Sequence, residues 1–425
     1  MRWLGNVLSR MCLVISAAMA LGVPVGYAAL PLLPVCSWPV ESTGQGILNV
    51  ATQDTNTTYW FMPIDTSRWK SVVIQGIYPN ARFFNFATYD QRGLLTDTLF
   101  DSDIVPDSGG SNPFTMAATG SRSANASYTV HIVHIGASNG GSPNFLSVGG
   151  NRLAFLVYRV IVPDKGLDRS GGVGVPAVTL VAQDGSMRRL RPCPFASAES
   201  SLGNMIPVLI ASGFTEAAGF LQGILSAANQ QTSIAGSCIA SSPSRQVAVS
   251  FGPAPGTDFF PNPPTAYLQT PNVCFQPNKI VVVRGRALVY PNTYLGGSVL
   301  EPVFDGQVQV RYWSMCNNDG VFPYPAVGCQ SDFQTRLDES QFYTYVVSND
   351  PAPPDWLPAD STWLAWGPTN LPITLIFRSI SFTPGYSPVP SAYAPAAVLC
   401  DEALFIAQGW QACFTAAGVK VATGP

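Results

Sequence analysis

Short runs of β-branched and aromatic residues alternate with turn-forming residues along most of this chain. Runs of this kind, bounded by Gly, Pro, Asn and Asp, predict β-strands. Asp184-Gly185 separates two of them and is typical of a tight hairpin turn. The chain is therefore predicted to be mainly β. The predicted strands are 47–50, 59–64, 71–77, 82–89, 128–135, 153–162, 178–183, 186–191, 280–286, 308–315, 342–347 and 373–382.

Two stretches of the chain carry the same blocks in the same order. Arg82-Phe83-Phe84 is matched by Arg311-Tyr312-Trp313, and an Asp follows at the same spacing in each copy. Chance similarity between β-strands is the alternative explanation, but the conserved order favours a duplicated β-sandwich over about 69–163 and 279–384. The other matched blocks are 72–76 with 281–285, 128–130 with 343–345, and 156–159 with 375–378.

Two segments lack the strand pattern. Residues 197–233 are rich in Ala, Leu, Gly and Ile and predict one or two helices, and 392–419 predict a C-terminal helix or helical hairpin. Within the first, 206–225 carry a single charge, Glu216, but polar and Gly interruptions favour a buried helix over a membrane-seeking hairpin.

These patterns predict two related β-sandwich (jelly-roll-like) modules with a helical insert and C-terminal helices. A mature chain of about 400 residues is long enough for more than one domain. The predicted divisions are a signal peptide at 1–28, the first module at 29–195, the insert and linker at 196–275, the second module at 276–390 and the helical segment at 391–425.

The first residues resemble a secretory signal peptide. An uncharged apolar run at 11–23 follows Arg2 and Arg10, and Gly26-Tyr27-Ala28 supplies small residues before a cut at Ala29. A membrane anchor needs roughly 18–20 apolar residues, and this run is interrupted by Pro24. We therefore expect an exported, periplasmic or extracellular protein with no stable membrane span after the signal is removed.

Cysteine usage is consistent with export. The chain has nine Cys, and one of them, Cys12, leaves with the signal peptide. An even number in an exported protein favours disulfides. Closeness in sequence suggests the pairs Cys316–Cys329 and Cys400–Cys413, and the other pairings stay open. The candidates are Cys36, Cys193, Cys238, Cys274, Cys316, Cys329, Cys400 and Cys413.

Composition excludes two classes of protein. Only 11% of the residues are charged and 47% are hydrophobic, which excludes a disordered chain because a large core can be buried. The net charge of −3 provides no basic stripe for nucleic acid, so no nucleic-acid partner is expected.

Several short blocks occur in a fixed order along the chain. They are 54–59 (DTNTTY), Ile64-Asp65, Arg82-Phe83-Phe84, Tyr89-Asp90, Arg311-Tyr312-Trp313-Ser314 and Asp355-Trp356-Leu357-Pro358. These blocks resemble an uncharacterised family of exported bacterial proteins with paired N- and C-terminal modules of unknown function. The first block resembles that family's Asn-Thr-Asp-Thr-Leu-Tyr block with Asp and Asn exchanged, and the last has Asp in place of the family's Asn. The resemblance implies an exported pair of β-sandwiches without an established activity.

Four repeat-related arginines are candidate ligand-binding residues. Arginine in an apolar strand needs a partner, because an unpaired buried charge is very costly. Asp90, Asp319 or backbone carbonyls would provide structural partners, and an anionic ligand is the alternative. The four are Arg82, Arg159, Arg311 and Arg378.

An acidic segment at 97–107 and a histidine pair could carry other chemistry. Asp101, Asp103 and Asp107 could bind calcium through oxygen ligands, could form turns, or could do acid–base work. His131 could serve as a ligand-binding residue or as a general base oriented by Asp103 or Asp107. His134 would point to the opposite face of the same strand. No cofactor is predicted apart from a candidate calcium ion.

Two classes of function follow from these residues. The first is a module that binds a small molecule or glycan, in which exposed Trp side chains could stack on sugar rings. The alternative is a carboxylate- or metal-assisted hydrolase or lyase that uses the 97–107 segment. The sequence has no nucleophile elbow, P-loop or dinucleotide-binding fingerprint.

Overall fold

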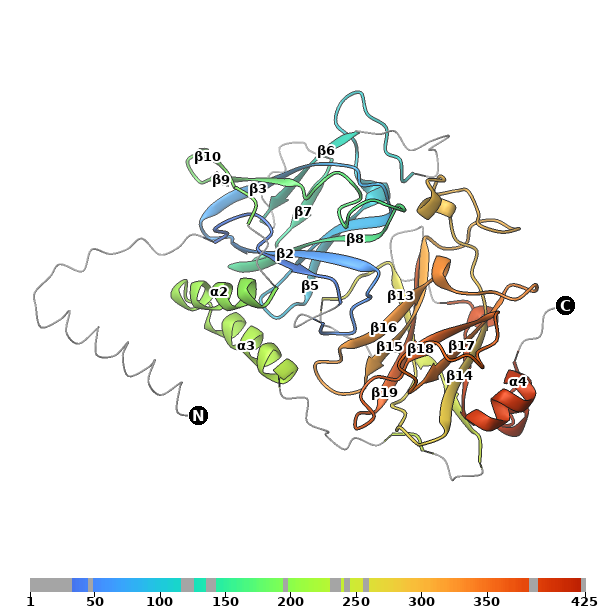
Figure 1. Cartoon of the computed structure of the whole chain (residues 1–425). Coiled ribbons are helices and arrows are strands. Elements are labelled where there is room, and N and C mark those ends of the chain that lie inside the picture. The colour runs from blue at the N-terminus through green and yellow to red at the C-terminus, as the bar shows by residue number, and fades with distance from the viewer. Residues whose placement is uncertain are drawn as a thin grey trace, which may run out of the picture.

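The fold consists of two β-sandwiches of two sheets each, with helices on their flanks (Figure 1). The computed structural model describes residues 33–44, 49–115, 126–134, 143–193, 198–229, 238–240, 245–254, 260–381 and 389–421. The predicted signal peptide lies outside the described residues. All four sheets have five strands, so the prediction of a mainly β protein with two sandwich modules is confirmed.

The first sandwich pairs the sheet β1-β2-β8-β4-β5 with the sheet β10-β9-β3-β6-β7. Its strands are antiparallel except for the β6–β7 pair. Aromatic and branched residues at alternating positions fill the space between the sheets, as the sequence pattern predicts. The strands are β1 (Val40–Ser42), β2 (Thr57–Asp65), β3 (Trp69–Ile77), β4 (Ala81–Tyr89), β5 (Leu95–Phe100), β6 (Ser127–Val133), β7 (Phe145–Ser147), β8 (Leu153–Pro163), β9 (Ala177–Ala182) and β10 (Met187–Arg189).

The second sandwich pairs the sheet β12-β13-β19-β15-β16 with the sheet β11-β20-β14-β17-β18. From β2 to β9 and from β13 to β20 the strand order is the same, including the parallel pair β17–β18, so the predicted duplication is confirmed. The strands are β11 (Val247–Ser250), β12 (Gly252–Pro253), β13 (Thr265–Gln269), β14 (Lys279–Arg286), β15 (Tyr312–Asp319), β16 (Ala326–Ser331), β17 (Phe342–Ser348), β18 (Ser361–Ala365), β19 (Ile373–Ile380) and β20 (Ala396–Asp401).

The second sandwich extends beyond its predicted limits of 276–390. Strands β11, β12 and β13 come from the predicted insert and linker, and β20 comes from the predicted C-terminal helical segment. β11, β13 and β20 were missed because each is completed by pairing with a strand distant in sequence: β11 pairs with β20, β13 with β19, and β20 with β14. β12 has only two residues and pairs with β13.

The helices cover the outer faces of two sheets. The predicted insert forms α2 (Ala198–Ala211) and α3 (Thr215–Asn229). Leu209 of α2 and Phe214 of the turn between the helices pack near Phe155 of β8. At the C-terminus α4 (Glu402–Ala416) packs on β14, with Phe405 and Phe414 in a shared cluster. Within the described ranges, no helix is long and apolar enough to cross a membrane. The described residues also form 3₁₀ turns at η2 (Asp101–Asp103), η3 (Asn292–Leu295), η4 (Asp332–Gln334) and η5 (Ser391–Tyr393).

Four disulfides link the elements. The two pairs predicted from sequence closeness are confirmed: Cys316–Cys329 joins β15 to β16, and Cys400–Cys413 joins β20 to α4. The other two join segments at the edges of the sandwiches. They are Cys36–Cys193 and Cys238–Cys274. Multiple disulfides are typical of proteins that mature in an oxidising compartment, which is consistent with export.

One glycine in each sandwich makes room for a tyrosine ring. A Cβ atom on Gly76 would lie 2.4 Å from the hydroxyl of Tyr128, and one on Gly285 would lie 2.2 Å from the hydroxyl of Tyr343. Each glycine is paired in register with that tyrosine on the neighbouring strand. Only glycine allows the buried ring to lie across the strand. The block that repeats in the sequence therefore gives the same packing of tyrosine on glycine in both sandwiches.

Candidate functional site

Two reciprocal ion pairs join the sandwiches. Arg82 of β4 contacts Asp332 of η4 at 2.6 Å, and Arg311, which directly precedes β15, contacts Asp101 of η2 at 2.7 Å. All four side chains are almost completely buried. Each aspartate also accepts a backbone N–H from the neighbouring strand of its own sandwich, Asp101 from Phe84 and Asp332 from Trp313. We call these four residues the inter-module clamp.

The clamp corrects the predicted arginine partners. Asp90 pairs instead with the exposed Arg92 and accepts the N–H of Leu94, and Asp319 is the last residue of β15, at the opposite end of the strand from Arg311. The prediction of Asp90 and Asp319 was wrong because it sought acidic partners within each repeat, whereas a backbone partner is confirmed for Arg311, whose Nη2 donates to Arg82 O at 2.7 Å. The true partners lie in the opposite repeat, where the 3₁₀ turn after the edge strand presents them.

Two segments cross from one sandwich to the other. The first arm, residues 49–56, precedes β2, and its Thr52 N–H donates to Tyr324 O in the second sandwich at 3.1 Å. The second arm, residues 260–264, precedes β13, and its Phe260 N–H donates to Gly93 O in the first sandwich at 2.9 Å. The first arm therefore reaches the β15–β16 hairpin of the second sandwich, and the second arm reaches the β4–β5 hairpin of the first. The two arms are reciprocal, as the two ion pairs of the clamp are.

A cavity of ≈ 130 Å³ lies between the two arms and the facing sheets. Repeat-related residues from both sandwiches line it, among them Thr57 with Thr265 and Ile161 with Ile380. The remainder of the lining is largely apolar, so the cavity combines a hydrophobic wall with a few polar groups, as small-molecule sites do. That apolar wall includes Val40, Val50, Phe61, Phe155, Met205 and Leu221.

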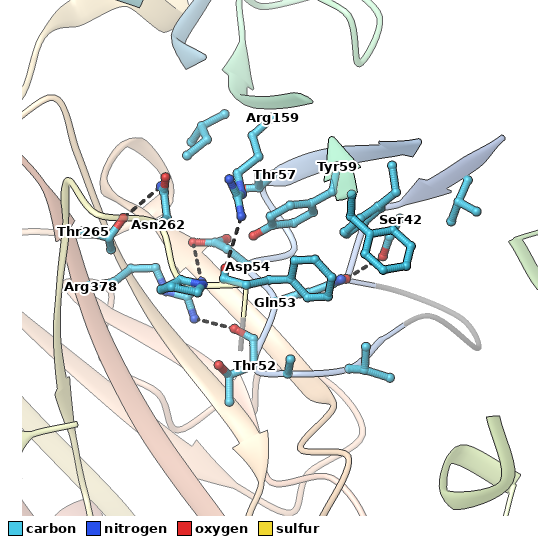
Figure 2. A pocket seen from close by; sticks show the side chains of 18 of the residues that line it. Ser42, Thr52, Gln53, Asp54, Thr57, Tyr59, Arg159, Asn262, Thr265 and Arg378 are labelled. Carbon is cyan, nitrogen blue, oxygen red and sulfur yellow. Dashed lines mark hydrogen bonds and ion pairs between the residues drawn. The ribbon is translucent and has the colours of Figure 1, made fainter. Parts of the chain in front are cut away.

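Arg378 of β19 is held by the first arm. Its Nη1 lies 3.7 Å from Asp54 Oδ2, and its Nη2 donates to Thr52 O at 2.9 Å. Asp54 also accepts the hydroxyls of Tyr312 and Ser314 from the opposite sandwich, at 2.8 and 2.6 Å. Figure 2 shows Asp54 between Arg378 and Arg159, the second arginine of the cavity. Arg378 therefore has a buried carboxylate as its counter-ion.

Arg159 of β8 occupies the equivalent place in the first sandwich. Its Nη2 donates to Tyr89 Oη at 2.6 Å and to Phe260 O at 3.1 Å. The residue of the second arm that corresponds to Asp54 is Asn262, which hydrogen-bonds to Thr265 (Figure 2). Within the described part of the chain, Arg159 Nη1 is buried and has no hydrogen-bond partner. Arg159 thus has no acidic counter-ion among the described residues.

Tyr59 and Tyr89, the two tyrosines beside Arg159, stay neutral. Tyr59 is paired in register with Arg159 on the neighbouring strand. Burial raises the pKa of Tyr59 and of Tyr89, although the nearby arginines oppose the shift. At neutral pH these phenols therefore add hydrogen-bonding groups and π faces but no negative charge. Arg159 lies 5.6 Å from the centroid of Tyr59 and 5.5 Å from that of Tyr89.

The predicted acidic segment does not gather its side chains in one place. Asp101 is engaged in the clamp, and Asp107 accepts the hydroxyl of Ser127. Asp103 lies beside the hydroxyl of Ser102, and burial raises its pKa. Calcium binding by Asp101, Asp103 and Asp107 stays a prediction. In the described ranges, the acidic or sulfur groups close enough to share an ion are Asp54, Cys316 and Cys329, and those two sulfurs form a disulfide.

The histidines lie apart from the cavity. His131 is half-buried on β6, and burial lowers its pKa. His134 Nε2 lies 2.6 Å from Thr66 O. Among the contacts of the described residues, none joins His131 to Asp103 or Asp107. The tryptophans in the described part of the chain fall into two groups: Trp38, Trp60, Trp69, Trp313 and Trp366 are buried, whereas Trp356, Trp363 and Trp410 are partly exposed.

Comparisons with known proteins show the fold. A crystal structure of an uncharacterised protein from Burkholderia cenocepacia is similar with a TM-score of 0.52 and 13% identity, over 91% of this chain and 86% of that one. A Vibrio parahaemolyticus structure has a TM-score of 0.37 and 11% identity, over 82% of this chain and 90% of that one. No protein-family model matches the chain, and no curated protein matches it. The chain shares its fold with an uncharacterised bacterial protein.

The sequence identified two of the residues that matter in the cavity. Arg159 and Arg378 were candidates because they repeat, and the structure brings them to one cavity, whereas Arg82 and Arg311 belong to the clamp. Asp54 and Asn262 were missed as site residues. The signal was present, because 54–59 and 262–267 share a pattern of Asp or Asn, then Thr, then Tyr, but the predicted repeat began too late to include it.

Proposed function

We propose that this protein is an exported binding protein that holds a small molecule in the cavity between its sandwiches. The observation that carries the proposal is a cavity with two buried arginines in an otherwise largely apolar lining. Buried charges in an apolar surrounding are costly, and binding sites are where such groups are commonly found. We also propose that the chain is a distant branch of the exported bacterial family that its motifs resemble.

The size of the cavity limits the ligand. An engineered apolar cavity of about 150 Å³ holds benzene, so a cavity of ≈ 130 Å³ fits an apolar body of about six non-hydrogen atoms. This size favours one small ring or a short chain over an oligosaccharide. A monosaccharide would need more polar partners than the described lining provides.

The proposal is tested with a fragment library screened by ligand-observed NMR. The library contains neutral and anionic compounds of that size, and the protein is the mature chain with its disulfides intact. Leu221 of α3 lines the cavity and is only half-buried, so Leu221→Trp should fill the space from the helix at little cost to folding. Fragments that bind the cavity should lose their saturation-transfer signal in this variant.

The matched control is Ile210→Trp. Ile210 lies on the neighbouring helix α2, is 49% exposed and is outside the cavity lining. Ile210→Trp introduces the same ring on the same pair of helices without entering the cavity, so fragment binding should be unchanged. A library without hits, or hits that persist equally in both variants, would remove the support for a ligand in this cavity.

A further inference from the structure

Resting on the proposed binding function, we infer that the ligand carries a single negative charge, and that its carboxylate or equivalent anion binds Arg159 at the place left by Asn262. The inference names the chemical class of the ligand: a small monoanion with an apolar body. It depends on a difference between the two copies of one repeated arrangement.

The two arginines have equivalent positions. Each lies opposite a tyrosine on the first paired strand, Arg159 opposite Tyr59 and Arg378 opposite Tyr267. Each donates Nη2 to a carbonyl of an arm, Arg159 to that of Phe260 and Arg378 to that of Thr52. Both carbonyls lie two residues before the arm residue that differs between the copies.

The residue at this arm position determines the net charge of the cavity lining. In the first arm it is Asp54, which lies 3.7 Å from Arg378. In the second arm it is Asn262, whose amide bonds Thr265 and accepts from Asn85 instead. The charged residues of the described lining are Asp54, Arg159 and Arg378, so one positive charge is left without a counter-charge.

The remaining charge is held by arginine, which stays protonated in proteins. Arg159 is 2% exposed, so water provides little of its solvation. The faces of Tyr59 and Tyr89 help through cation–π contacts, which are weaker than a buried carboxylate pair. With Nη1 still lacking a hydrogen-bond partner among the described residues, the guanidinium is prepared to bind an anion.

The rest of the lining defines the body of the ligand. The apolar wall formed by Val50, Phe61 and Phe155 favours a ring or short chain, and the cavity volume limits its size. A second anionic group is disfavoured because Asp54 already neutralises Arg378 and would repel it. Benzoate and benzamide are suitable probes because they have the same shape and differ in charge.

The test is isothermal titration calorimetry of both probes at pH 7. Benzoate should bind at least tenfold more tightly than benzamide, because hydrogen bonds to a charged group are stronger than neutral ones. Arg159→Met should abolish that preference and keep benzamide binding. Equal binding of the two probes to the unmodified protein would overturn the inference and leave the cavity proposal intact.

An isosteric pair of variants provides a second, independent test. Asn262→Asp gives Arg159 the carboxylate that Arg378 has, and should weaken benzoate at least tenfold with little effect on benzamide. Asp54→Asn removes the other counter-charge and should strengthen benzoate binding. Circular dichroism checks that each variant folds. If neither Asn262→Asp nor Asp54→Asn alters the affinity for benzoate, the anion does not bind at Arg159. If no neutral or anionic fragment binds in the library screen, the proposed function fails first.

Discussion

Breaking the inter-module clamp should destabilise both sandwiches at once. In Asp332→Asn, Arg82 keeps its charge but loses a carboxylate 2.6 Å away, at a site where both side chains are completely buried. Removing one partner of a buried pair costs about 3–5 kcal/mol. Two unit charges about 4 Å apart interact by about 4 kcal/mol at an effective dielectric of about 20, which gives the same size. Asp101→Asn should behave alike, because its pair with Arg311 is equally buried.

The assay is the free energy of unfolding from urea titration of the oxidised protein, followed by tryptophan fluorescence. The double variant Arg82→Met/Asp332→Asn should recover most of the loss, because it leaves no unpaired buried charge. Asp90→Asn is the matched control, since Asp90 pairs with the exposed Arg92 and should cost less than about 1 kcal/mol. A loss in Asp90→Asn as large as that in Asp332→Asn would refute the reasoning.

Four further outcomes are expected. Gly285→Ala should lower the free energy of unfolding, measured by urea titration, by about 1–3 kcal/mol because its Cβ meets Tyr343, whereas Gly328→Ala on β16, where a Cβ meets nothing within 4 Å, should not. Burial raises the pKa of Asp338, but the ion pair with Arg284 and the backbone N–H groups outweigh burial and lower that pKa overall. The ionised Asp338 therefore stabilises the fold above about pH 4, and this stabilisation is lost as the pH falls further. Asp338→Asn should flatten the acid limb of a plot of melting temperature against pH. Intact mass of the exported protein should correspond to a chain starting at Ala29 with eight hydrogens lost; thiols that titrate under denaturing, non-reducing conditions would contradict it. If Asp101, Asp103 and Asp107 bind calcium, millimolar calcium should raise the melting temperature and EDTA lower it, and an unchanged temperature would leave turn formation as their role.

The sequence alone predicted what local pattern determines. Alternating strands, the duplication and the short-range pair Cys316–Cys329 follow from neighbours along the chain. The partners of Arg82 and Arg311 did not, because each aspartate belongs to the other repeat and no local spacing connects them. The same holds for the pair Cys36–Cys193, whose members are 157 positions apart in the sequence.

The cavity was predictable only in part, for a related reason. Repetition identified Arg159 and Arg378 as unusual charges in apolar strands, but which of them keeps a counter-ion depends on an arm that crosses from the opposite sandwich. Asp54 and Asn262 look like ordinary turn residues in the sequence, where both types are common. Their difference acquires meaning only when the arms are placed beside the arginines.

The reciprocal arms also bear on what gene duplication makes accessible. Two identical subunits that exchange arms around a twofold axis must carry every charge twice, so the formal charge at their shared centre is even. Once the two halves belong to one polypeptide, each can mutate alone, and the formal charge at the centre can be odd. Asp54 in one arm and Asn262 in the other provide such an odd sum. A fused pair can therefore recognise a monovalent ion with a single guanidinium, which a strictly symmetric dimer of the same parts could not do.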